Sequence, residues 1–299
     1  MTKRTAKQIV FALLAVNAAA VFWRFAIPSA PQTLRVTFLD VGQGDAAVIE
    51  SPGGKIILVD TGGVSHESGD DEGRRTVAPF LRSRGINRID MILLSHPHLD
   101  HIGGAATLLT LFPVGLLMDN GQDADKPPVA TILTAAQTHH IAYRAARRGQ
   151  IIELGDGAVL RVLAPTEAET HGSVNNGSMV LRLEYKQTAF VFTGDAELDE
   201  EDDMVTDKMP LACDALKVGH HGSDSSTTPE FLAEAHPHFA IVSVGKHNLY
   251  GHPRPDILER LSASGAKTYR TDENGAVICV SDGATVKVET LRDSSRQNP

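Results

Sequence analysis

The sequence has few cysteines, no long excess of positive charge and no apolar run of full membrane-spanning length. Cys213 and Cys279 each sit in an apolar, strand-like run, so we expect two buried small side chains, which either pair or stay free. The longest apolar segment, residues 9–23, has about 15 residues, whereas a spanning helix needs about twenty. With 42% hydrophobic and 22% charged residues, the chain also lacks a disorder signature and is typical of a globular protein.

The charge balance argues against a general polyanion-binding protein. The formal charge is −9 although the first thirty residues are purely basic, so the remainder carries about −13. Such a surface disfavours tight, nonspecific nucleic-acid binding unless the charge is segregated locally. Arg144, Arg147 and Arg148 are expected on one helix and are the candidates for a local basic patch; a solvated helix face is the alternative.

The N-terminus differs from the rest of the chain. A basic stretch, an apolar stretch and Arg24 predict a signal peptide or membrane anchor over residues 1–27, followed by a linker over 28–33. This segment is expected to engage the membrane or the secretion machinery. The domain would then lie in the periplasm or outside the cell. An ordinary amphipathic leader helix is the alternative, and residues 291–299 are expected to form a flexible tail.

Strands and helices alternate over residues 34–290, which predicts one α/β domain. Two similar halves, each with a hairpin, a further strand and a helix, indicate two sheets with helices outside both, an αββα sandwich. Strands are expected at 34–39, 46–50, 55–59, 89–94, 179–185, 189–192, 215–218 and 239–244, and helices at 77–84, 196–205, 229–235 and 255–265. The buried strands end in loops rich in Asp, His and Gly, so these loops are expected to gather at one edge of the sandwich.

One of these loops carries the motif His-x-His-x-Asp-His. On a tight loop, His96 and His98 are expected to face one cation, while Asp100 and His101 face a second. Imidazole nitrogen and carboxylate oxygen suit Zn²⁺, and also Mn²⁺ or iron. The alternative is a solvated polar loop that holds no metal, and the density of histidine in this motif argues against it.

Further ligands must come from distant loops, because a metal ion takes about four. Asp195, which ends a strand, is the expected bridging carboxylate between two cations, although alone it would more often be a turn or helix-capping residue. The His220-His221 pair ends the next strand and offers one more imidazole. Spacing does not decide between the two; we favour His220 as the ligand and His221 as a phosphate contact or proton donor.

Other polar side chains are candidates for supporting roles. Asp60 ends a strand at the same edge and is expected to orient a ligand histidine, with a turn residue as the alternative. Asp40 and Asp45 lie in a glycine-flanked loop where a supporting and a purely structural role are equally open. His252 is expected to touch the substrate or act as a general acid, with a surface histidine as the alternative.

At these residues the chain resembles the metallo-β-lactamase superfamily, and more narrowly the hydrolase domain of the ComEC/Rec2 competence proteins and their standalone relatives. The resemblance covers roughly residues 34–285 and implies an αββα sandwich with a one- or two-metal site at the sheet edge. Besides the histidine motif, the matching stretches are Asp40 to Ala46, Asp60 to Gly63, Asn175 to Ser178, Thr193 to Asp195, Lys217 to Ser223 and Tyr250 to Pro253.

One departure concerns a ligand histidine that members commonly place between the histidine motif and the bridging aspartate. The matching positions here are Asn175, Asn176 and Ser178, which are weak ligands, and together with Ser223 they are expected to support the site or contact substrate. The first metal position, at His96, His98 and Asp195, is therefore expected to be weakly held or completed by water. The second position, at Asp100, His101, Asp195 and His220, has a full ligand set.

The resemblance implies a metal-dependent hydrolase, with metal-activated water attacking a phosphodiester in nucleic acid or another phosphoester. Asp100 is expected to be essential for turnover, and His221 or His252 to protonate the leaving group. Two alternatives stay open. One is a β-lactamase-like or other ester hydrolase, and the other is a non-catalytic, metal-holding partner in DNA uptake, which the missing histidine supports.

Overall fold

The computed structural model describes residues 32–64 and 69–292, which form two facing β-sheets. Within these residues, the eight-stranded sheet has, in order, β15 Val286–Thr290, β14 Val277–Ser281, β1 Leu34–Phe38, β2 Ala47–Glu50, β3 Ile56–Val59, β4 Ile89–Leu93, β5 Val114–Asp119 and β6 Ala142–Ala145. The seven-stranded sheet has β13 Lys267–Arg270, β12 Phe239–Val242, β11 Ala215–Lys217, β10 Thr188–Phe192, β9 Val180–Tyr185, β8 Ala158–Ala164 and β7 Ile151–Gly155.

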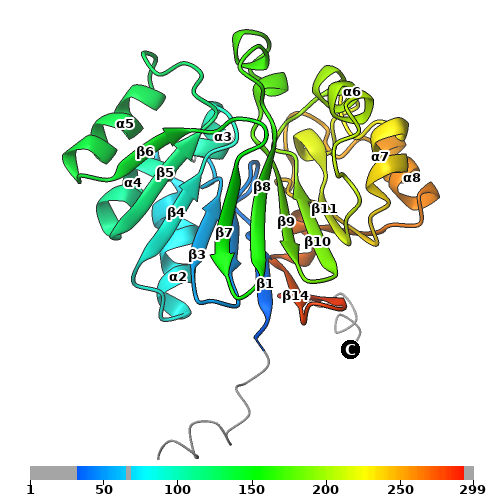
Figure 1. Ribbon diagram of the computed structural model, residues 1–299, viewed down its shortest axis with the longest axis horizontal. Helices are drawn as coiled ribbons and strands as arrows, with labels where there is room; N and C mark the ends of the chain where they lie inside the picture. Colours follow the sequence, from blue (N-terminus) through cyan, green and yellow to red (C-terminus); the bar gives the residue numbers. More distant parts are fainter. Residues whose placement is uncertain (1–31, 65–68, 293–299) are drawn as a thin grey trace, which may run out of the picture. The chain divides into compact units, whose positions relative to one another are not determined.

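Helices lie outside both sheets (Figure 1). Those connected to the first sheet are η1 Gly73–Val77, α2 Ala78–Ser83, α3 Leu99–Ile102, α4 Ala105–Leu111 and α5 Val129–Thr138. Those connected to the second are η2 Glu169–His171, η3 Asn175–Gly177, α6 Leu198–Thr206, η4 Gly219–Gly222, α7 Pro229–Ala235, α8 Pro255–Ala263 and α9 Thr271–Asn274. The predicted αββα arrangement is thereby confirmed.

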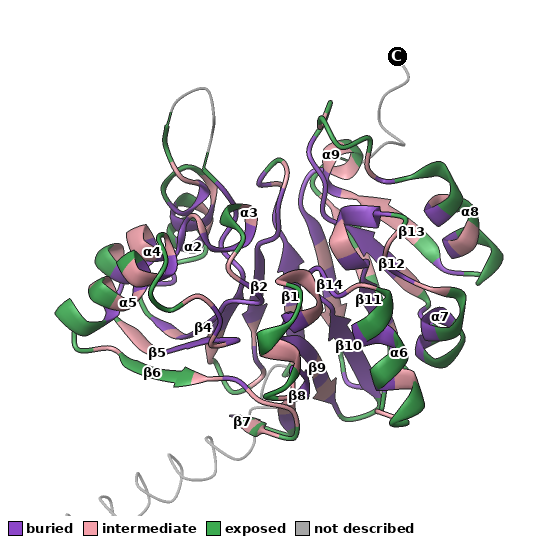
Figure 2. Ribbon diagram, turned by 90° about the horizontal axis from the view of Figure 1, so that it is seen from above, coloured by how far each residue is buried: buried purple, intermediate pink, exposed green. Residues whose placement is uncertain are grey.

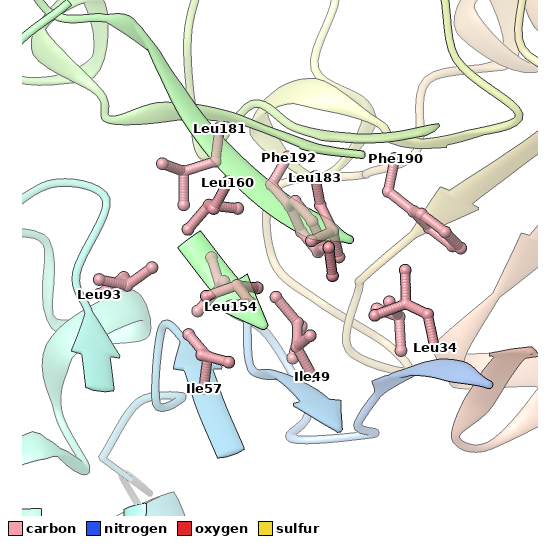
Figure 3. Packing of buried hydrophobic residues seen from close by; sticks show 14 of the residues in the cluster. Leu34, Ile49, Ile57, Leu93, Leu154, Leu160, Leu181, Leu183, Phe190 and Phe192 are labelled. Carbon is pink, nitrogen blue, oxygen red and sulfur yellow. The ribbon is translucent and has the colours of Figure 1, made fainter. Parts of the chain in front are cut away.

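The central core lies between the sheets and follows from the two-residue period of the strands. In β1, Leu34, Val36 and Phe38 all point to the same side, where they are almost fully buried. They meet side chains from the second sheet, among them Phe192, whose ring stacks on Phe38 with 5.7 Å between centroids. Figure 3 shows hydrophobic side chains of both sheets, among them Ile49, Leu160 and Phe190, pointing into this layer. This contact holds the two sheets face to face, so that loops from both sheets meet at one edge of the sandwich.

Each outer sheet surface is covered by helices that bury one apolar face. Leu81 of α2, Leu108 of α4 and Ile132 of α5 pack on the first sheet, while Phe231 of α7 and Leu261 of α8 pack on the second. Figure 2 shows the inward faces of these helices as buried and their outward faces as exposed. Both cysteines are buried and unpaired, which settles the alternative left open by the sequence.

Two sequence predictions need comment. Arg144, Arg147 and Arg148 do not share a helix: Arg144 lies in β6, and the other two follow it in a loop. Arg147 pairs with Glu167, and Arg148 pairs with Glu169 and Asp207, so carboxylates neutralise the expected basic patch. The predicted leader over 1–27 lies outside the described residues, as does most of the predicted tail. Across 32–64 and 69–292 we find no helix of the length and apolarity needed to cross a bilayer.

Candidate metal centre

The site forms where four strands end at the same edge of the two sheets. β3 runs parallel to β4, and β10 runs parallel to β11, so their carboxyl ends lie together within each sheet. Asp60 directly follows β3, the histidine motif follows β4, Asp195 follows β10 by three residues, and η4 with its two histidines follows β11. The loops that follow these strands therefore gather at one edge of the sandwich, as the sequence predicts (Figure 1).

Asp195 is the centre of the cluster. Its carboxylate is 2% exposed, and four imidazole rings surround it. Atom Oδ1 lies 3.3 Å from His101 Nε2. Atom Oδ2 lies 3.7 Å from His96 Nε2, 3.6 Å from His221 Nε2 and 3.8 Å from His220 Nε2. A buried carboxylate within 4 Å of four imidazole nitrogens is placed to hold a cation together with some of them.

We call one group of candidate ligands that includes this carboxylate the inner half-site: Asp100, His101, Asp195 and His221. His101 is fully buried, and its Nδ1 lies 2.9 Å from Asp60 Oδ2. Asp60 also accepts hydrogen bonds from Ser95, at 2.7 Å from the backbone N–H and 2.8 Å from the hydroxyl. With Nδ1–H donating to this fixed carboxylate, Nε2 is turned toward Asp195 and is the ring atom that would hold a metal ion.

His221 is held in the same way from the other sheet. Its Nδ1 lies 2.9 Å from the Ser243 carbonyl oxygen, and its Nε2 lies 3.3 Å from Asp100 Oδ2. The ring is 1% exposed, whereas the neighbouring His220 side chain is 24% exposed. The buried imidazole beside Asp100 and Asp195 is thus that of His221, whereas the sequence interpretation favoured His220 as the ligand.

The electrostatics of the inner half-site favour ionised carboxylates. Burial would raise the pKa of Asp195, but the charges of His101 and His221 hold it well below its usual range. Conversely, burial would lower the pKa of His101, and the carboxylates of Asp195 and Asp60 outweigh it and raise that pKa well above normal. The pKa of His221 is raised by the same competition, with Asp195 and Asp100 as the main carboxylates. In metal-free protein these rings would therefore hold protons that a cation displaces.

Asp45 and Lys217 lie behind the two rings. One ligand atom each of Asp45, His101, Asp195 and His221 falls within 4.8 Å of the others. However, Asp45 approaches the Nδ1 atoms of His101 and His221, at 3.8 and 3.5 Å, while the Nε2 atoms face away toward Asp195. Lys217 Nζ lies 2.7 Å from Asp45 Oδ2 and is 3% exposed. We therefore assign Asp100 as the inner carboxylate ligand beside Asp195, and Asp45 as a buried partner of Lys217.

We call the second group that includes this carboxylate the outer half-site: His96, His98 and Asp195. One ligand atom from each of these three lies within 4.8 Å of the others. His96 is buried, and its Nδ1 lies 3.0 Å from the Ser95 hydroxyl, while His98 is exposed at the rim. Burial and the charge of His101 hold the pKa of His96 well below its usual range. This half-site is the more open one, with one ligand ring at the surface.

His220 and His252 line the approach to the outer half-site. His220 Nδ1 lies 3.1 Å from Glu197 Oε1 and 3.2 Å from the Ser225 hydroxyl, which itself donates to Glu197. The His252 ring lies 5.7 Å from that of His220, centroid to centroid. Burial, with the nearby charges of His220 and His221, lowers the pKa of His252 to about 4. His252 is therefore uncharged at neutral pH, which speaks against a role as a proton donor there.

The remaining predicted residues divide into those near the site and one away from it. Ser178 accepts a hydrogen bond from the Asp195 backbone N–H at 3.2 Å, and Ser223 bonds the Ser225 hydroxyl at 2.9 Å. Asn175 and Asn176 hold the loop after β10: their amide nitrogens lie 3.3 Å from carboxylates of Glu197 and Asp199, respectively. The Asp40 carboxylate pairs with Arg292 at 3.2 Å, which favours the structural role of the two that the sequence left open.

Three supporting residues escaped the sequence interpretation: Ser95, Glu197 and Lys217. Lys217 had a usable signal, because a single charged residue in an otherwise apolar strand needs a buried partner. Glu197 and Ser95 had none, because an acidic residue before an acidic helix and a serine beside a histidine motif are ordinary at such places.

The chemistry of the donor set fits a metal ion. Among the described residues, His101 Nε2, His221 Nε2 and Asp195 Oδ1 are buried and make no hydrogen bond. Leaving a buried polar atom unpaired costs about 1–3 kcal/mol, so three converging ones call for a common partner. Two imidazole nitrogens and a carboxylate oxygen, with Asp100 beside them, suit a divalent cation such as zinc, manganese or iron.

Comparison with known proteins agrees with this geometry. Residues 39–247 match the family described as the metallo-beta-lactamase superfamily. ComE operon protein 3 of Bacillus subtilis is 34% identical over 86% of this chain, and Recombination protein 2 of Haemophilus influenzae is 31% identical over 82%. The matched regions are 34% and 28% of those proteins, so the chain spans about a third of their length.

Solved structures share the fold at low sequence identity. CmlA, a diiron beta-hydroxylase from Streptomyces venezuelae, superposes with a TM-score of 0.55 at 13% identity, covering 88% of this chain and 55% of that one. Igni18, a metallo hydrolase from Ignicoccus hospitalis, gives 0.50 at 15% identity, covering 82% and 98%. These likenesses concern the fold.

Proposed function

The chain belongs to the metallo-β-lactamase superfamily, and from that premise we propose that it hydrolyses phosphodiesters, with nucleic acid as the substrate. The observation that carries the proposal is the set of buried, unpaired ligand atoms of His101, His221 and Asp195 facing one point beside Asp100. A phosphodiester is favoured because the His-His-Gly-Ser pattern resembles that of relatives acting on phosphoesters. Recombination protein 2 is named for recombination, and competence protein ComA of Neisseria gonorrhoeae, 30% identical over 86% of this chain, is named for competence.

When bound, a divalent cation supplies a water of lowered pKa and neutralises charge that develops on the phosphoryl oxygens. We propose zinc or manganese for this role, as one ion or two. His101, His221, Asp195 and Asp100 would hold the inner ion, and His96 and His98 would share Asp195 with an outer one.

The protein's own groups fix the orientation of this site. Asp60 and the Ser243 carbonyl oxygen each hold one Nδ1–H, so both ligand rings keep Nε2 turned to the centre. His220, fixed by Glu197 and Ser225, lies at the rim, where it is placed to contact a substrate oxygen. The hydrolytic machinery is thus preorganised by hydrogen bonds that do not depend on substrate.

The test uses the whole chain, stripped of metal and then loaded with zinc or manganese in separate samples. We expect turnover of bis-p-nitrophenyl phosphate and cleavage of single-stranded DNA only after metal is restored, with elemental analysis giving the bound stoichiometry. His101→Ala removes a buried ligand and is expected to abolish both activities. His139→Ala removes an exposed histidine at the end of α5 and serves as the matched control.

One alternative has a specific observation in its favour. Asn175 and Asn176, which the family resemblance matches to the place of a third histidine, hold the loop after β10, so the outer half-site would have one imidazole fewer. A metal-holding module without turnover would have the same feature. Stoichiometric metal binding combined with no cleavage of either substrate, in zinc and in manganese, would favour that module over the hydrolase.

A further inference from the structure

The loop over residues 245–254, which we call the rim loop, presents an exposed aromatic ring beside the metal centre. Tyr250 is 61% exposed and Leu249 is 99% exposed. The Tyr250 ring stacks on that of His252, with 5.8 Å between centroids and 26° between planes. His252 in turn lies against His220, whose Nε2 is 3.8 Å from Asp195. Two ring contacts therefore separate the exposed tyrosine from the central carboxylate.

The rim loop is built to hold this ring in place. The Asn248 side chain donates to the carbonyl oxygens of Gly245 and His252, at 3.0 and 2.7 Å. Its own oxygen accepts from the backbone N–H groups of Tyr250 and His252, at 3.2 and 3.0 Å. One amide thus satisfies four backbone groups across the loop. A large aromatic side chain that is both exposed and fixed loses little conformational freedom when it binds a ligand.

Both ends of the rim loop are fastened to the site. The Gly245 N–H donates to the Gln43 side chain at 3.1 Å, and a side chain at position 245 would meet the Gln43 backbone at 2.6 Å. At the other end the Arg254 N–H donates to the Gly222 carbonyl oxygen, directly after the two histidines of η4, at 2.9 Å. The position of Tyr250 is therefore tied to that of the metal ligands.

The charged side chains of the rim loop itself are all basic. The rim loop contains Lys246 and Arg254 and no acidic residue, although the chain as a whole has a formal charge of −9. Positive charge next to an exposed aromatic ring is the combination by which proteins bind single-stranded nucleic acid, with the cations on the phosphates and the ring under a base.

We propose that Tyr250 stacks on a base of a single-stranded nucleic acid whose phosphodiester lies in the metal centre. This rests on the proposed function. Tyr250 is then a specificity-determining residue: it distinguishes nucleic acid from phosphodiesters that carry no base. Stacking is sequence-tolerant because every base has a π-face, so the preference concerns single-strandedness and the presence of a base.

The experiment compares two oligomers of equal length, oligothymidylate and the same phosphodiester chain with abasic residues throughout. Each oligomer is incubated with wild type, Tyr250→Ala, Tyr250→Phe and the control Leu249→Ala, which removes the exposed apolar side chain next to Tyr250. We expect Tyr250→Ala to raise KM for oligothymidylate about tenfold with little change in kcat. Tyr250→Phe keeps the ring and is expected to match wild type. On the abasic oligomer all four proteins should have the same KM.

Equal loss on both oligomers, or no change in KM for Tyr250→Ala, would overturn the assignment and leave the exposed pair to a protein partner. Binding of fluorescein-labelled oligomers to the zinc-loaded proteins, followed by anisotropy, separates this inference from the proposed function. If wild type cleaves nothing, the hydrolase proposal fails. The stacking proposal still stands or falls on whether Tyr250→Ala alone weakens binding of oligothymidylate and spares that of the abasic chain.

Discussion

The two half-sites around Asp195 share one carboxylate but differ in how their other ligands are held. In the inner half-site the rings of His101 and His221 are buried, and each has its Nδ1 bonded to a buried acceptor. In the outer half-site His98 is exposed, and Asn175 points its amide to Glu197 at 3.3 Å. The difference teaches that ligand number alone does not define a metal site, because the hydrogen bonds behind each ligand set its orientation. We expect the inner half-site to bind its ion first and more tightly.

Removing the shared carboxylate should have the largest effect, since it breaks both half-sites at once. Asp195→Ala is expected to abolish turnover and to lower metal content to below one ion per chain. Asp202→Ala on α6, which removes an exposed carboxylate nearby in sequence, is the control and should keep both. Elemental analysis and turnover of bis-p-nitrophenyl phosphate provide the measurement. Full metal content in Asp195→Ala would show that the half-sites do not share this ligand.

Substituting the two adjacent histidines of η4 one at a time tests which of them is the inner ligand. His221→Ala removes an inner ligand and should weaken the tighter zinc ion by about a hundredfold or more, whereas His220→Ala should cost the same ion less than about tenfold. Competition titration with a chromophoric chelator measures both. The reverse order would return the ligand role to His220, the residue that the sequence interpretation favoured.

Weakening the hydrogen bond that orients the His101 ring, while keeping the ring itself, tests the role of the hydrogen bonds behind the ligands. Asp60→Asn keeps the size of the side chain but replaces the carboxylate that accepts from His101 Nδ1. We expect zinc affinity to fall about 10- to 100-fold at the inner half-site and to stay unchanged at the outer one. Because Asp60 also accepts from Ser95, thermal unfolding of the metal-free variant must be followed in parallel. An equal loss at both half-sites would indicate general damage to the loop.

A change of pH should affect the half-sites unequally. The raised pKa values of His101 and His221 mean that, below those values, a cation must displace their protons. Inner affinity should therefore fall with falling pH, about tenfold per pH unit for each displaced proton. The pKa of His96 is lowered, so that ring has no proton to displace near neutrality. Calorimetric zinc titrations at pH 6 and 8 measure this, and an inner affinity independent of pH would contradict the assigned protonation.

The sequence was sufficient for the sandwich because the apolar runs of its buried strands have few alternatives. It was insufficient for the middle of the chain, where β6 reads Ala-Tyr-Arg-Ala. Alanine and arginine favour helix, and the expected helix carrying Arg144 is in fact a strand. Only pairing with β5 makes it one, and such a long-range contact leaves no local signal.

The sequence predicted the part of the candidate site that directly follows a strand. It did not predict the part where the backbone adopts a left-handed conformation. The histidine motif follows a strand directly, so its loop could be placed. His220 and His221 both have left-handed backbone conformations, with φ of 45° and 56°. Non-glycine residues rarely adopt this conformation, and two in succession redirect the side chains in a way that spacing does not reveal. This explains why sequence reasoning could name the pair but not which ring turns inward.

The buried charges behind the metal centre also bear on how long the folded protein survives. Asp45 and Asp60 lie there, beside the ligand carboxylate of Asp195, and Lys217 pairs with Asp45 at 2.7 Å. Cation binding to the folded form alone adds about 2.7 kcal/mol of stability at a free concentration one hundred times Kd. The concentration of the free ion would then set the melting temperature and the resistance to proteases. A lack of the ion would lower the amount of folded protein in addition to emptying the metal centre.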